Sequence, residues 1–152
     1  MGIITIVKNV KKIHQDYVVI IDIGKFYYTY GKDSYIISYL FNYKLNTYEN
    51  VSRCGFANNS INKVIAKLEQ KKINYLILDR RNNYDVDKKF DNKNLNNYEK
   101  IFKKAKVKIN LKKRIENISS YLYSNLESRD INKLINELEE VIKNEGRKIQ
   151  SN

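Results

Sequence analysis

The chain has 152 residues and carries 29 Lys and Arg against 17 Asp and Glu, a formal net charge of +12. This length predicts one domain, or one domain with a small appendage, and the 42% hydrophobic content predicts a core rather than disorder. No apolar run approaches the ~20 residues that a membrane span requires. A single cysteine and a single histidine exclude an intrachain disulfide and a cysteine-based zinc site. The start of the chain lacks the features of a secretory signal, so we expect a cytoplasmic protein without membrane contact, metal or cofactor.

The first part of the chain predicts alternating strands and helices. Three short runs rich in β-branched or aromatic residues predict strands, at residues 3–7, 17–23 and 26–30. Gly24, between the last two runs, indicates a bulge or bend that re-aims the side chains after it. Asp33 is suited to cap a helix over residues 34–41.

The pattern of the next fifty residues is also α/β. Further strands are predicted at residues 43–45, 51–56, 75–78 and, at a sheet edge, 86–90. Residues 58–60 are N-cap residues for a helix whose apolar positions, at 61–68, recur every three or four residues. This helix and the strands beside it predict a β-α-β unit.

A polar stretch rich in Asn and Asp at residues 80–97 predicts a boundary between a domain over residues 1–90 and a helical segment over residues 91–152. Beyond it, apolar spacings of three and four predict two or three amphipathic helices, the last ending at Gly146. Such helices must pack on each other, on the first domain or on a partner. The predicted fold class is α/β, a mixed β-sheet with flanking helices followed by a C-terminal helical segment.

A motif follows the predicted strand at residues 17–23, and its members are Gly24, Phe26 and Tyr27. It resembles the mismatch-recognition domain at the N-terminus of MutS-type DNA repair proteins, where Gly-x-Phe-Tyr-Glu precedes an Asp-Ala that opens a helix. Asp33 and Ser34 stand at the place of that Asp-Ala. Residues 53–56 look like the family's next strand, which ends in a glycine and a hydrophobic residue. The resemblance covers roughly residues 17–80 and implies a fold like that of MutS domain I.

The resemblance implies a specific role for Phe26. In MutS-type proteins this phenylalanine wedges into the minor groove beside a mispair, where unstacking a base step costs least. The family's glutamate two residues later is here Tyr28, which can stack or donate a hydrogen bond but offers no carboxylate. The two rings share one face of the strand, and Tyr27 faces the other side as a core residue. A wedge further predicts that both rings are exposed near positive charge, to which Lys25 and Lys32 would contribute.

The chain departs from MutS proteins in lacking their further domains and the G-x-x-x-x-G-K-[ST] loop that binds ATP phosphates. Stand-alone MutS-like domains are known as accessory proteins beside bacterial reverse transcriptases of diversity-generating retroelements. The resemblance therefore implies a non-enzymatic accessory protein that binds DNA, RNA or their hybrid and assists a reverse transcriptase.

Eight basic residues with no acid among them crowd one segment, whereas the residues after it are comparatively acidic. This asymmetry is typical of a surface that binds a polyanion. A solvated helix face, or salt bridges between two helices, would use the same charges. The basic residues are Lys100, Lys103, Lys104, Lys106, Lys108, Lys112, Lys113 and Arg114.

Two other functions fit parts of the sequence. A strand ending in Asp-x-Gly also opens ribonuclease-H-like nucleases, in which Asp22 would bind Mg²⁺ together with Asp79. That chemistry needs three or four converging carboxylates. Besides Asp22 and Asp79, the weaker candidates are Glu69 and Asp85. The other alternative is a purely protein–protein interaction module, in which the C-terminal helices dock a partner. The aromatic strand from Phe26 onward would then be an ordinary core strand.

Overall fold

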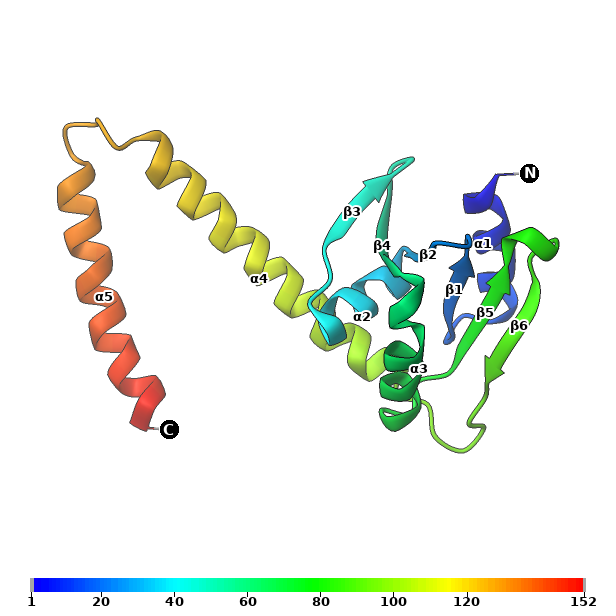
Figure 1. Ribbon diagram of the computed structural model, residues 1–152. Helices are drawn as coiled ribbons and strands as arrows, with labels where there is room; N and C mark the ends of the chain where they lie inside the picture. The colour runs from blue at the N-terminus through cyan, green and yellow to red at the C-terminus, as the bar shows by residue number, and fades with distance from the viewer. Residues whose placement is uncertain (1, 152) are drawn as a thin grey trace. The chain divides into compact units, whose positions relative to one another are not determined.

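The computed structural model describes the backbone of residues 2–151 and the side chains of residues 2–146. The chain divides into two compact units, one ending at Asn110 and the other starting at Leu111. The elements follow one another along the chain as α1 (Ile3–Ile13), β1 (Val18–Asp22), β2 (Phe26–Tyr30), α2 (Lys32–Phe41), β3 (Leu45–Tyr48), β4 (Val51–Ala57), η1 (Asn58–Ser60), α3 (Ile61–Gln70), β5 (Tyr75–Asp79), η2 (Arg80–Asn82), β6 (Asp85–Phe90), α4 (Tyr98–Ser124) and α5 (Ile131–Ser151) (Figure 1).

The first unit is built on one mixed sheet with the strand order β3-β4-β2-β1-β5-β6. Only β1 and β5 pair in parallel, and every other neighbouring pair is antiparallel. The connection from β4 through α3 to β5 joins two strands that run in the same direction with β2 and β1 between them. This arrangement confirms the predicted α/β class and the β-α-β unit, and it leaves β3 and β6 as the two edges.

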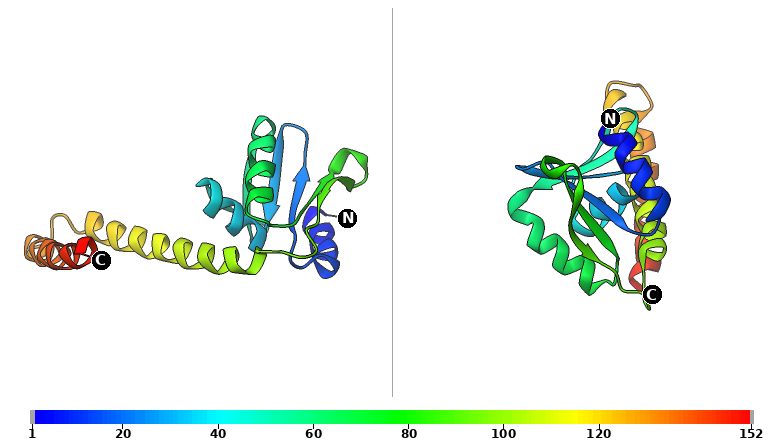
Figure 2. Two further views of the ribbon diagram at one scale, coloured as in Figure 1. Left: turned by 90° about the horizontal axis from the view of Figure 1, so that it is seen from below. Right: turned by 90° about the vertical axis from the view of Figure 1, so that its right-hand side faces the viewer.

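Helices cover both faces of this sheet (Figure 2). On one face, α2, α3 and the first turns of α4 bury a large apolar cluster that includes Ile20, Ile36, Leu68 and Tyr75. On the other face, α1 covers a smaller cluster around Val7. The central strand β1 is buried over its whole length, as the uninterrupted apolar run in its sequence predicts.

The prediction of a strand at residues 3–7 is wrong, because this run belongs to helix α1. Val7 is buried against the sheet, and Ile3 and Val10 pack beside it at spacings of four and three residues. A short apolar run is compatible with a strand or a buried helix, and here the helical spacing continues to Ile13.

Three predictions of local signals also need correction. Asp33 is not an N-cap but a fully buried helical residue, and Gly31 with φ of +60° occupies the cap position of α2. Residues 58–60 form the short helix η1, and Ser60 takes the N-cap position of α3 without forming a capping hydrogen bond through its side chain. Helix α5 does not end at Gly146 but continues to Ser151.

Helix α4 begins inside the core of the first unit. Tyr98, Ile101 and Ala105 are buried on its first turns, which is why residues as far as Asn110 group with the sheet rather than with a segment starting at residue 91. In the second unit, the rest of α4 and α5 form the predicted helical segment. None of the helices among the described residues combines the length and the apolar character needed to cross a membrane.

Candidate nucleic-acid interface

The turn between β1 and β2 places Phe26 at the start of a strand. Gly24 has φ of +105°, a conformation that favours glycine, and its N–H donates to the carboxylate of Asp22 at 2.8 Å. Asn58 holds the same turn from the other side, since its side chain donates to the carbonyl of Gly24 and its N–H to that of Lys25. The turn is therefore held by hydrogen bonds with β1 and with η1, and Gly24 makes the bend that the sequence predicts.

The aromatic residues of β2 alternate between the two faces of the sheet. Tyr27 lies in the larger core and stacks on Phe56 with ring centroids 5.5 Å apart. Phe26, Tyr28 and Tyr30 share the opposite face, where Phe26 is 47% exposed and Tyr30 is buried. The predicted placement of Tyr27 is confirmed, and Phe26 has the exposure that a wedge requires.

Tyr28 differs from the expectation because Arg53 covers its ring. The Arg53 guanidinium lies 4.4 Å from the centroid of Tyr28 and 4.6 Å from that of Tyr48, between the two rings. Tyr28 also lies over Gly55, where an added Cβ would come within 2.5 Å of its ring carbon Cε1. Tyr28 is consequently only partly exposed, and Phe26, at a centroid distance of 6.2 Å, is the more accessible ring.

Arg53 is a site residue that the sequence analysis missed. It pairs with Tyr30, and Gly55 pairs with Tyr28, in the antiparallel ladder between β2 and β4. Directly opposed residues of such a ladder share a face. The two-residue spacing of Arg53 and Gly55 was visible in the sequence, but their position beside Tyr28 depends on this register.

Lys25 and Lys32 lie at opposite ends of β2. Lys25 is exposed in the turn next to Phe26. Lys32 starts α2 beyond the other end of the strand, where its Nζ lies 3.4 Å from a carboxylate oxygen of Glu99 and 4.5 Å from the ring centroid of Phe102. The structure thus brings Lys25 but not Lys32 close to the candidate wedge.

Helix α4 carries the basic run, and all eight of its basic side chains are exposed. Lys108 is the one that lies over an aromatic ring, 5.5 Å from the centroid of Tyr39. The helix starts at Tyr98, whose hydroxyl donates to Asp33 near the end of β2 that is remote from Phe26. The residues from Lys100 to Lys108 belong to the first unit, and Lys112, Lys113 and Arg114 belong to the second.

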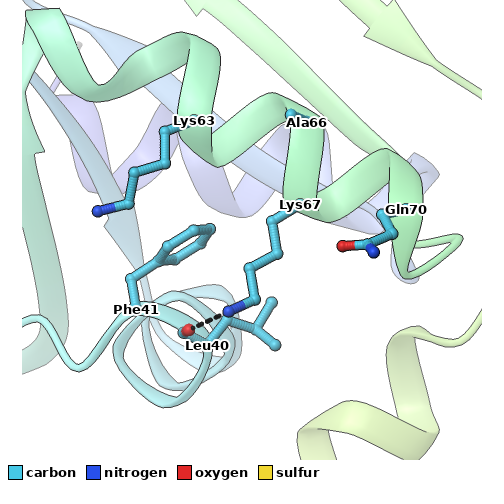
Figure 3. A pocket seen from close by; sticks show the side chains of 6 residues that line it. All are labelled: Leu40, Phe41, Lys63, Ala66, Lys67 and Gln70. Atoms are coloured by element: carbon cyan, nitrogen blue, oxygen red, sulfur yellow. Dashed lines mark hydrogen bonds between the residues drawn. The ribbon is translucent and has the colours of Figure 1, made fainter.

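A cavity lies away from this face, between the end of α2 and α3 (Figure 3). It has a volume of about 650 Å³, and Lys63 and Lys67 of α3 face Phe41 across it. Lys67 donates to the carbonyl of Leu40 at 3.0 Å, a bond that satisfies the last turn of α2. This use of Lys67 is structural, since a cation at a helix C-terminus stabilises the free carbonyls.

The nuclease alternative finds no metal site among the described residues. Asp22 and Asp79 do lie side by side at the ends of β1 and β5, but Arg81 lies 3.9 Å from the first carboxylate and 3.6 Å from the second. No group of three or more His, Cys, Asp or Glu that could hold a metal is found in this part of the chain. Cys54 does not offer a thiolate ligand either, because burial raises the pKa of its thiol to about 12 and the thiol stays protonated.

Comparison with protein families agrees with this geometry. The model of MutS domain I matches residues 1–135, which is most of the chain. A search of curated proteins found no match.

Proposed function

The chain belongs to the MutS domain I family, and from this membership we propose that it is a non-enzymatic nucleic-acid-binding protein that inserts Phe26 at weakly stacked base steps. The observation that carries the proposal is the 47% exposure of Phe26 on a strand whose turn is held by hydrogen bonds. An apolar ring held rigidly at a surface can unstack a base step without first being released from a core.

The residue at position 28 affects which bases such a wedge would recognise. Tyr28 replaces the carboxylate of MutS-type proteins, and Arg53 stacks on its ring. A stacked cation and a phenol favour any accessible base or phosphate over one particular mispair. We therefore propose a preference for weakened or single-stranded nucleic acid, DNA, RNA or hybrid, rather than discrimination among mispairs.

The basic run on α4 would supply the sequence-independent part of the affinity. Reversing Lys103, Lys104 and Lys108 to glutamate should weaken binding to every oligonucleotide by a similar factor, because groups that bind phosphates read no base information. The slope of log affinity against log salt should fall by about 1 for each phosphate that the variant no longer neutralises. Fluorescence anisotropy with duplex, mismatched, single-stranded and hybrid oligonucleotides over a range of salt concentrations measures both effects.

The matched control reverses three exposed lysines outside the run, Lys44, Lys88 and Lys133. This control changes the net charge equally, so it should lower the affinity much less. If the two triple variants bind alike, the run is an ordinary solvated face. If the unmodified protein binds none of the oligonucleotides, the proposed function itself is wrong.

The second unit supports a protein partner as a further part of this proposal. Its helices expose a row of large apolar side chains, which amphipathic helices normally bury. We propose that they dock a reverse transcriptase of a diversity-generating retroelement. The exposed residues include Leu111, Ile115, Ile118, Val141 and Ile142.

Replacing Ile115 and Ile118 with serine should lower the affinity for that enzyme by about tenfold or more, since each large apolar side chain contributes about 1.5–3 kcal/mol when fully buried. The partner to be used is a purified reverse transcriptase of a diversity-generating retroelement, titrated by calorimetry. Glu116→Gln, on the same exposed helix, is the control. Equal affinity for both variants would exclude this surface as the docking site.

A further inference from the structure

A cavity of about 450 Å³ opens on the same face of the sheet as Phe26 and Tyr28. Nothing in the family relationship assigns it a ligand. The described residues that line it include two cations and no acid. Its principal lining residues are Ile3, Tyr28, Tyr30, Tyr48, Arg53 and Arg80.

Arg53 lies at the wall of this cavity in an orientation set by its neighbours. The rings of Tyr28 and Tyr48 lie 4.4 and 4.6 Å from its guanidinium carbon, and a guanidinium held against aromatic rings can still form hydrogen bonds through its N–H groups. The Nε atom of Arg53 is buried and has no hydrogen-bond partner among the described residues. Since Nε has almost no accessible surface, a ligand in the cavity would accept from the terminal N–H groups of the guanidinium, and Nε would report on that binding from beside them.

The surroundings of Arg53 suit an anion. Among the described residues, no carboxylate forms an ion pair with Arg53 or with Arg80. Burial is the largest influence on the pKa of Tyr30 and raises it, although the charge of Arg53 and hydrogen bonding from its side chain oppose this, so the hydroxyl stays protonated at neutral pH. The cavity is also lined by Gly2 and Ile3, where α1 starts without an acidic residue in its first turn.

We propose that this cavity binds a phosphate group, held by the edge of Arg53 and by Arg80. A planar guanidinium and a tetrahedral oxyanion form paired, charge-assisted hydrogen bonds. Because the cavity includes Tyr28, which neighbours Phe26, the phosphate belongs to the nucleotide strand at the wedge. This last step rests on the proposed function, whereas binding of phosphate itself does not.

The test follows the Nε–Hε signal of Arg53 by nuclear magnetic resonance, assigned as the cross-peak that Arg53→Lys removes. Inorganic phosphate is titrated at constant ionic strength with chloride as the balancing anion. In a second arm, a short single-stranded phosphodiester oligonucleotide is compared with its uncharged methylphosphonate analogue. The expected result is a saturable shift with phosphate and with the phosphodiester, but not with the analogue.

The variants Arg53→Gln and Arg80→Gln should each weaken phosphate binding by about tenfold or more, the effect of losing charge-assisted hydrogen bonds. Arg129→Gln, at an exposed arginine outside the cavity, should change nothing. Thermal melts of the same variants identify any that fail to fold, and Arg53→Lys, which keeps the charge but not the planar fork, should also bind weakly.

The outcomes separate the two claims. A shift with phosphate while no oligonucleotide binds supports the phosphate site and contradicts the proposed function. A shift that the methylphosphonate analogue reproduces, or no shift with phosphate at all, overturns the phosphate site even if oligonucleotides bind. Retained phosphate affinity in both glutamine variants overturns it as well.

Discussion

Replacing Asp33 with alanine should lower the free energy of unfolding by about 3–5 kcal/mol, the range for removing one partner of a buried ion pair. Asp33 has no exposed surface, and its carboxylate accepts from the Nζ of Lys11 at 2.9 Å and from the N–H of Val19 at 3.0 Å. The hydroxyl of Tyr98 donates to the same carboxylate. This one side chain therefore links α1, β1, α2 and α4.

The electrostatics of this network explain the size of the expected effect. Burial raises the pKa of the Asp33 carboxyl, and the nearby charge of Lys11 and the hydrogen bonds oppose that rise. Burial and the Asp33 charge also raise the pKa of Tyr98, so its hydroxyl stays protonated and donates. Without the carboxylate, the buried Val19 N–H and the Tyr98 hydroxyl lose their acceptor. Lys11 loses its ion pair while it keeps the carbonyls of Gln15 and Tyr17.

Urea unfolding followed by circular dichroism measures this prediction. Tyr98→Phe removes only the hydroxyl and should cost about 1.5–3 kcal/mol, the range for a hydrogen bond to a charged group. Asp85→Ala, at an exposed carboxylate on the edge strand β6, should change the stability by no more than about 0.5 kcal/mol. A loss for Asp33→Ala as small as that of the Asp85 control would contradict the role given to the network.

Replacing Phe26 with alanine should weaken binding to single-stranded or mismatched oligonucleotides by about 1–3 kcal/mol, the range for one lost base–aromatic stack. The same change should cost little stability, because a ring that is 47% exposed leaves no cavity when it is removed. Fluorescence anisotropy and thermal melts on one protein sample separate these two effects.

Phe56 provides the matched control for this prediction. It is 5% exposed, and its ring stacks between Tyr27 and Tyr43 in the larger core. Phe56→Ala should therefore destabilise the fold by about 3–5 kcal/mol, and any loss of binding should follow unfolding. If Phe26→Ala melted as far below the unmodified protein as Phe56→Ala, Phe26 would be a core residue and the wedge proposal would be wrong.

Several features of this protein follow from local sequence alone. The β-branched run at residues 18–22 is the central strand, and Gly24 turns the chain because its positive φ favours a residue without a side chain. The alternation that separates Tyr27 from Phe26 and Tyr28 follows from the two-residue period of any strand. Local sequence also determines α3, because its apolar spacing of three and four residues specifies both its helical state and its buried face.

Other features were decided only by tertiary packing. Residues 3–7 form a helix because their apolar side chains meet the sheet at helical spacing, and a five-residue run does not show that spacing. Asp33 has the sequence context of a cap, but α1, β1 and α4 enclose it. Apolar stripes of the same period are buried at the start of α4, where they pack in the larger core, and exposed from Leu111 onward.

The arrangement around Arg53 illustrates the physical reason. Residue spacing specifies which side chains share one strand face, but not which strand lies beside it. The pairing of Tyr28 with Gly55 and of Tyr30 with Arg53 comes from the register of β2 on β4, which lie more than twenty residues apart in the chain. Local sequence therefore determined that Phe26 and Tyr28 share one strand face, whereas tertiary packing decided that Phe26 is exposed and that Arg53 and a cavity lie beside Tyr28.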